Sequence, residues 1–182
     1  RDYSLVPPHP TSLDRLSAAG IPTVGVGKIE DIFAGRGVAR SVHTEGNDDG
    51  MRQTLELARG LERGFVFVNL VDFDMLFGHR RDPSGYARAL ERFDTALVQL
   101  ESELRPDDLV LLTADHGNDP TKMETTDHTR EYVPILATGP GVRPAVELGT
   151  RASFADVGAT VEEWLGLEPS GPGQSFAAEI RA

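Results

Sequence analysis

The sequence predicts an α/β domain built around a mostly parallel β-sheet. Two short, strongly apolar runs, residues 65–71 and 109–113, have the composition of buried strands, and they alternate with segments of helical periodicity. The order helix, strand, helix, strand, helix, strand is typical of layered α/β domains. The length of 182 residues corresponds to about one domain, so we expect residues 1–182 to form a single unit.

Four segments are predicted to be strands. Residues 65–71 are aromatic or β-branched except for one asparagine and one leucine, and residues 109–113 are similarly apolar. Both are predicted as interior strands, buried on two faces. Residues 21–26 and 133–138 are weaker candidates, because each contains a proline near its start, where the missing N–H is tolerated.

Four segments are predicted to be helices. The clearest covers residues 83–104, where apolar side chains recur at spacings of three and four and form one stripe: Tyr86, Leu90, Phe93, Leu97, Leu100 and Leu104. A second helix is predicted for residues 154–165, between capping and stop signals. Shorter helices are predicted for residues 11–19 and 48–61.

The composition excludes several classes of function. Acidic residues outnumber basic ones 29 to 18, for a formal charge of −11, which counts against nucleic acid or an anionic membrane as the partner. No apolar run is long enough to span a bilayer, and no signal peptide is visible. Cysteine is absent, so disulfide scaffolds, thiolate zinc sites and cysteine nucleophiles are excluded. We expect a cytoplasmic protein.

Three histidine-bearing clusters carry the chemical signal. Two of them directly follow the two strongest predicted strands, and the third precedes residues 133–138. The first cluster contains Asp74 and His79, the second contains Asp115 and His116, and the third contains His128. Ligand sites of open parallel sheets gather outside the carboxyl ends of the strands, so we expect these side chains to meet there.

These clusters predict a metal site. A single histidine beside an aspartate is more often an ion pair or part of a capped loop, but three such clusters, two of them at strand ends, favour metal binding. Imidazole and carboxylate donors without sulfur suit Mn, Zn, Fe or Mg rather than a structural zinc. His9 and His43 have no comparable neighbours and are interpreted as ordinary histidines.

The spacing of the donors limits how they can be used. Asp74 and His79 are five residues apart, so we expect a loop that folds both toward one ion, with Gly78 easing the bend. Asp115 and His116 are adjacent and can share an ion only if the strand has already turned. Five donors around one ion would leave little room for a substrate, so two ions are predicted, as in many phosphoryl-transfer enzymes.

Three strings contain these clusters: Asn-Leu-Val-Asp-Phe-Asp-Met-Leu-Phe-Gly-His-Arg-Arg-Asp-Pro at residues 69–83, Thr-Ala-Asp-His-Gly-Asn-Asp-Pro at 113–120, and Thr-Asp-His-Thr-Arg-Glu-Tyr-Val-Pro at 126–134. They resemble the bacterial phosphopentomutase family of the alkaline phosphatase superfamily. The resemblance extends through nearly all of the chain. The fold it implies is a three-layer alkaline-phosphatase-like core, of which this chain would be the C-terminal part, without the N-terminal part and most of the cap domain.

The resemblance also implies a reaction. Members interconvert α-D-ribose 1-phosphate, or its 2-deoxy analogue, with the 5-phosphate through a phosphothreonine and a pentose 1,5-bisphosphate, which also serves as primer. The implied ligands of two manganese ions are Asp74, His79 and His128 for one ion, with Asp115 and His116 contributing to the other. Lys28 would contact phosphate or substrate, although a lysine after a strand is more often simply solvated.

The family's threonine nucleophile and a further aspartate ligand have no counterpart in this chain. We therefore expect a missing N-terminal segment of the same protein to supply them, and we expect this chain alone to be inactive. Arg80 and Arg81 could each pair with phosphate or neutralise a neighbouring aspartate, and Asp119 and Asp127 are candidates for orienting an imidazole.

Two other interpretations stay open. One is a different member of the superfamily, such as a phosphatase, a phosphodiesterase or the cofactor-independent phosphoglycerate mutase. The other is a non-catalytic module that is stabilised by metal.

Overall fold

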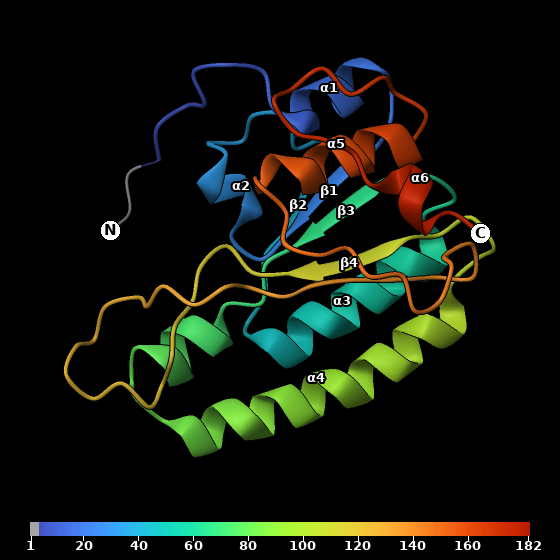
Figure 1. Cartoon of the computed structure of the whole chain (residues 1–182). Helices are drawn as coiled ribbons and strands as arrows, with labels where there is room; N and C mark the ends of the chain where they lie inside the picture. The colour runs from blue at the N-terminus through green and yellow to red at the C-terminus, as the bar shows by residue number, and fades with distance from the viewer. Residues whose placement is uncertain (1–3) are drawn as a thin grey trace.

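The chain forms three layers (Figure 1). The computed structural model describes residues 4–182. The strands lie in the middle, with α3 and α4 on one side and α1, α5 and α6 on the other. The helices are α1 (Ser12–Ala18), α2 (Ile29–Ile32), α3 (Asn47–Gly60), η1 (Phe73–Gly78), α4 (Pro83–Glu103), α5 (Ala155–Trp164) and α6 (Ala177–Ile180). The strands are β1 (Thr23–Val26), β2 (Arg40–Val42), β3 (Phe65–Val68), β4 (Val110–Thr113) and β5 (Ile135–Thr138).

A three-stranded parallel sheet with the order β2-β1-β3 forms the centre. The central strand β1 is buried along its whole length, because it has a neighbour on both edges and helices on both faces. Val26 stands in register with Val42 on one side and Val68 on the other, so all three strands end at the same edge. The α/β class with a parallel sheet is therefore confirmed.

The prediction that residues 65–71 and 109–113 are fully buried interior strands is wrong. The first is shortened to β3, an edge strand of the parallel sheet, and Phe67 on it is 36% exposed. The second is shortened to β4, which pairs antiparallel with β5 instead of joining β3. Each of these strands has only one paired neighbour within residues 4–182, which leaves part of its apolar surface uncovered.

The predicted helices are confirmed with ends shifted by at most one residue, as α1, α3, α4 and α5. The apolar stripe of α4 is partly confirmed, since Leu100 is buried whereas Leu90 is 48% exposed. The short elements α2, β2, α6 and η1 have too few residues to show a period and were not predicted. None of the helices within residues 4–182 combines the length and hydropathy that a membrane span needs.

Helix α4 fixes the position of η1, the segment that follows β3. The ring of Phe73 packs 5.4 Å from the ring of Tyr86 and 6.3 Å from that of Phe93, measured between centroids. The side chain of Asp82 accepts a hydrogen bond of 2.8 Å from the backbone N–H of Gly85 and so caps the start of α4. Aromatic packing and the cap together anchor both ends of the η1–α4 connection.

A buried carboxylate joins α1 to α5 on the opposite side of the sheet. The Glu162 side chain has no exposed surface, accepts a hydrogen bond of 2.5 Å from the Ser12 hydroxyl and forms an ion pair with Arg15. Burial works to raise the pKa of the Glu162 carboxyl, but the hydrogen bonds from Arg15 and Ser12 outweigh it and hold that pKa below its ordinary value. The charge is therefore part of the packing between these helices.

Candidate metal centre

A π-helix brings the first two predicted ligands together. In η1 the backbone N–H of His79 donates to the carbonyl of Asp74 at 2.9 Å, a bond that reaches back five residues instead of the four of an α-helix. Residues 74 and 79 thus lie about one turn apart and can face the same side. The prediction of a folded loop at this point is wrong, because the wider helical turn achieves the same pairing.

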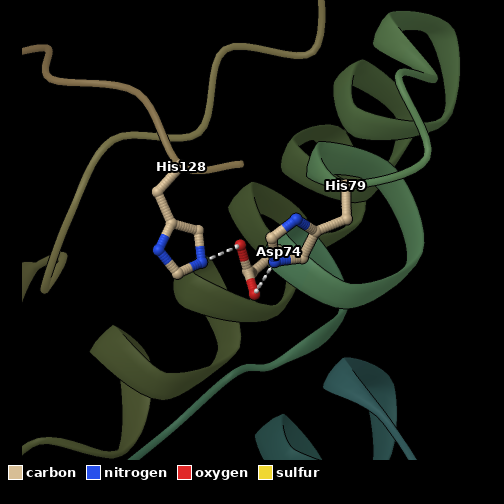
Figure 2. Close-up of side chains that lie close together, drawn as sticks. All are labelled: Asp74, His79 and His128. Carbon is tan, nitrogen blue, oxygen red and sulfur yellow. Dashed lines mark ion pairs between the residues drawn. The ribbon is translucent and has the colours of Figure 1, made fainter. Parts of the chain in front are cut away.

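Asp74 lies between two imidazoles (Figure 2). Its Oδ2 is 3.2 Å from Nε2 of His79, and its Oδ1 is 3.4 Å from Nε2 of His128. One ligand atom from each of the three residues lies within 4.8 Å of the others. The side chains are between 32% and 48% exposed, so the cluster is open to solvent on one side. The structure therefore brings together the three predicted ligands of one ion.

The other two predicted ligands lie on the neighbouring turn of chain. We call residues 114–134 the β4–β5 loop. A bridge between Gly117 and Thr129 draws its two arms together, and the His116 ring stacks on the His128 ring with centroids 3.6 Å apart. Asp115 lies 3.7 Å from His116, between Oδ2 and Nε2, and its side chain is 77% exposed. Asp115 and His116 therefore lie next to the cluster but do not belong to the three-ligand group.

Hydrogen bonds orient the side chains of the cluster. The carbonyl of Thr126 can only accept, so its contact of 2.5 Å makes Nδ1 of His79 the donor, and in the neutral imidazole Nε2 then carries a lone pair. That lone pair faces a carboxylate oxygen of Asp74, an arrangement that is repulsive unless a proton or a cation lies between them. The Asn118 amide donates to Oδ1 of Asp74 at 2.5 Å. The donor set and its orientation thus fit a divalent cation.

Asp119 and Asp127 do not orient an imidazole as predicted. The carboxylate of Asp119 accepts hydrogen bonds from the backbone N–H and hydroxyl of Thr121, which hold its pKa below the ordinary value. Asp127 contributes its backbone carbonyl to Arg81. The orienting group for His79 is a main-chain carbonyl instead, which no side-chain pattern in the sequence could reveal.

Sequence reasoning missed Asn118. The sequence pattern assigns no role to Asn118, whereas its side chain donates a hydrogen bond to Asp74. Its position directly after Asp-His-Gly, in a loop that carries two predicted ligands, is the signal that could have identified it.

Gly78 allows the Asn118 side chain to approach the η1 backbone closely, and it does not form the predicted bend. A Cβ at this position would stand 2.4 Å from the Asn118 amide nitrogen and 3.0 Å from the Phe73 carbonyl oxygen. We expect Gly78→Ala to displace Asn118 from Asp74, to lower Mn²⁺ affinity about tenfold and to cost about 1–3 kcal/mol of stability. A Mn²⁺ titration and thermal unfolding of the complete protein check this.

Gly60→Ala is the matched control for Gly78, because its Cβ would meet nothing within 4 Å at the end of α3. We expect unchanged affinity and a change in stability of less than about 1 kcal/mol for it. Wild-type Mn²⁺ affinity in Gly78→Ala would show that the fit of Asn118 against Gly78 does not matter.

Lys28 lies at the same edge of the sheet but is not a member of the three-residue cluster. It follows β1 and precedes α2, and it lines a hollow of about 610 Å³ together with Ser4, Glu30 and Asp31. Since β1 and β3 end in register, the segments of Lys28 and of η1 leave the sheet side by side. His43 lies 4.0 Å from Glu30 and is 77% exposed, outside the cluster as expected.

Comparison with known proteins agrees with this geometry. The sequence pattern that defines the Metalloenzyme superfamily matches residues 2–169. A phosphopentomutase from Anaeromyxobacter dehalogenans (strain 2CP-C) is 56% identical over 180 residues, which are 99% of this chain and 45% of that protein. One from Symbiobacterium thermophilum is 53% identical over 180 residues, again 99% of this chain and 45% of that protein. The chain thus spans about half the length of the curated relatives it matches.

The fold has a solved counterpart. A phosphoglycerate mutase from Leishmania mexicana, solved at low cobalt concentration, superposes with a TM-score of 0.69 over 90% of this chain and 38% of its own length. Its identity of 21% makes this a likeness of fold alone. The superfamily pattern covers most of the residues, and an Asp-His-His cluster lies at the sheet edge. The curated relatives named above are phosphopentomutases. The chain therefore belongs to the Metalloenzyme superfamily.

Proposed function

We propose that the complete protein is a phosphopentomutase. It would interconvert α-D-ribose 1-phosphate, or 2-deoxyribose 1-phosphate, with the 5-phosphate through a phosphothreonine and a pentose 1,5-bisphosphate. The observation that carries this proposal is the identity of 56% to a phosphopentomutase over 99% of the chain. The clustering of Asp74, His79 and His128 supports it. A cytoplasmic location belongs to the same proposal, and the absence of cysteine is compatible with it.

Two divalent ions, most simply Mn²⁺, are part of this proposal. Asp74, His79 and His128 would hold one ion, and Asp115 and His116 would contribute to the second. When bound, such ions neutralise charge on a transferring phosphoryl group. The residues of this chain hold the ligand atoms in place, and the exposed side of the cluster gives a small pentose phosphate access.

A further segment of the protein would complete the site. The threonine nucleophile, the additional aspartate ligand and the cap domain are expected in the part of the relatives that this chain does not cover. Exposed apolar side chains on strands support a docking surface for that segment, with Phe67 36% and Leu136 59% exposed. Phe65 of β3 and Leu111 of β4 also pack on one core cluster, so the two unpaired strand edges lie in the same region. We expect this chain alone to have no mutase activity.

Phosphorus NMR of the complete protein tests the proposal. The sample contains Mn²⁺, α-ribose 1-phosphate and a trace of pentose 1,5-bisphosphate. We expect the 5-phosphate signal to grow without release of inorganic phosphate. Growth of inorganic phosphate alone would assign the protein to the phosphatases of the superfamily. No change with either ribose or deoxyribose 1-phosphate would overturn the mutase and favour a module that only binds metal.

Lys28 would bind the phosphate of the substrate or of the phosphothreonine. A charge-assisted hydrogen bond is worth about 1.5–3 kcal/mol, so we expect Lys28→Met to lower kcat/KM about 10- to 100-fold. Lys122→Met is the control, because Lys122 forms an exposed ion pair with Glu131 at 3.6 Å and has no proposed role. Equal kinetics for the two variants would make Lys28 a solvated lysine.

A further inference from the structure

The guanidinium group of Arg81 is tied to the chain segments that carry the metal ligands. Its three nitrogen atoms all donate, and their acceptors are the carbonyls of Gly78 at 3.0 Å, Asp119 at 3.0 Å, Thr125 at 2.5 Å and Asp127 at 2.8 Å, and the Asn118 side-chain oxygen at 2.8 Å. Gly78 immediately precedes His79, Asn118 lies two residues after His116, and Asp127 immediately precedes His128. One side chain therefore joins three ligand-bearing segments.

These contacts leave Arg81 little capacity for phosphate. A guanidinium binds phosphate best through two parallel N–H groups. Here Nε and both terminal nitrogens already donate to the protein, so no free pair of N–H groups is left. The acceptors are four main-chain carbonyls and one side-chain amide oxygen, all of them neutral. Arg81 thus differs from an arginine whose guanidinium is hydrogen-bonded to a carboxylate or left free for an anion.

The Asn118 amide links Arg81 to Asp74. Its oxygen accepts from Arg81 and its nitrogen donates to Oδ1 of Asp74. If Arg81 were absent, the amide could rotate and present its oxygen to the carboxylate. Arg81 therefore fixes which end of the amide meets Asp74, and through it the orientation of that carboxylate.

The backbone of Arg81 is held in an unusual conformation. Its φ is +52°, in the left-handed region that non-glycine residues rarely adopt. This single residue turns the chain between η1 and α4 and directs the side chain toward the β4–β5 loop. Such a conformation costs about 1–3 kcal/mol and persists where surrounding contacts require it.

We propose that Arg81 is a positioning residue of the metal centre, which sets the mutual placement of His79, His116 and His128 and the orientation of Asp74. The inference rests on the metal-dependent function proposed above and assigns to Arg81 a role distinct from phosphate binding. The direction of the change in metal affinity distinguishes this role. A cation beside a cation site weakens metal binding by repulsion, so loss of the Arg81 charge alone would tighten binding. Loss of a positioning residue would instead weaken binding.

The test compares Mn²⁺ affinity among variants of the complete protein, measured by the EPR signal of free Mn²⁺. We expect Arg81→Ala and Arg81→Lys each to weaken binding about 10- to 100-fold, because an ammonium group cannot reach all these acceptors. The visible spectrum of bound Co²⁺ should change with Arg81→Lys, which reports ligand geometry directly. Arg80→Ala is the control, since Arg80 is adjacent and exposed, and its affinity should stay equal or tighten.

Wild-type or tighter affinity in Arg81→Ala would overturn the inference. If that variant does not fold, as judged by circular dichroism with EDTA, Asn118→Ala takes its place and should weaken binding about tenfold; wild-type affinity there would overturn the inference equally. Asp74→Asn in the same assay separates the two proposals. If Asp74→Asn retains wild-type affinity, the metal centre itself is misassigned, whereas loss of binding there and not in Arg81→Ala refutes only the role of Arg81.

Discussion

Replacing Asp74 by Asn should reduce Mn²⁺ affinity by more than about 100-fold. Asp74 is the only anion in the three-ligand cluster and lies within 3.4 Å of both imidazole nitrogens, so the substitution removes the charge that both sides of the site face. Changing a group that merely supports a ligand costs about 10- to 100-fold, and loss of the central carboxylate should exceed that. Isothermal titration of the complete protein with Mn²⁺ measures the effect.

The control for Asp74→Asn is Asp94→Asn, which makes the same change in charge at an exposed position on α4. We expect Asp94→Asn to bind Mn²⁺ as the wild type does. His128→Ala should resemble Asp74→Asn, because His128 would supply the ligand atom on the other side of Asp74. Retained affinity in both site variants would place the metal elsewhere.

Replacing Glu162 by Ala should destabilise the fold by about 3 kcal/mol. The carboxylate has no exposed surface, and its removal takes away the ionic partner of Arg15, which is 26% exposed, and the acceptor of the Ser12 hydroxyl. Urea unfolding with EDTA present measures the effect without a contribution from metal. Glu163→Ala, on the next residue of α5, should change stability by less than about 0.5 kcal/mol.

The contribution of Glu162 should also depend on pH in a defined direction. Because its pKa is lower in the folded chain than in the unfolded one, its charge stabilises the fold above the unfolded value of about 4.3. That stabilisation is lost as the pH falls through the lower folded pKa. The difference in unfolding free energy between the wild type and Glu162→Gln should therefore shrink steadily below about pH 4.3. A constant difference down to pH 3 would contradict this account.

The helices and the ligand cluster could be predicted from the sequence, because both leave local signals. Helix α4 shows a repeating apolar spacing and α5 lies between capping and stop signals, and the residues of the cluster are histidines and an aspartate placed near strand ends. The means by which Asp74 meets His79 could not be predicted. The residues of η1 between them are a short apolar run, and such a run does not distinguish a π-turn from an α-turn or a loop.

The strand pairing was mispredicted for a reason visible in the connections. Consecutive parallel strands need a crossover of a dozen or more residues, usually a helix, as α3 provides between β2 and β3. The β4–β5 loop contains no helix, and β5 returns antiparallel to β4. The roles of Arg81 and Asn118 were beyond sequence reasoning, because their acceptors belong to segments that meet only in three dimensions.

Strands β4 and β5 form a hairpin, and the β4–β5 loop is its long tip. Thr113 stands opposite Ile135, and the bridge between Gly117 and Thr129 continues the pairing beyond the strands. If β5 slipped by one residue along β4, each of its side chains would lie on the opposite face of the hairpin. The placement of His116 and His128 therefore depends on the register of two strands that contain none of the predicted ligands. Insertions and deletions during evolution should consequently be confined to residues 120–124, beyond the bridge and before Thr125, where added length does not shift that register.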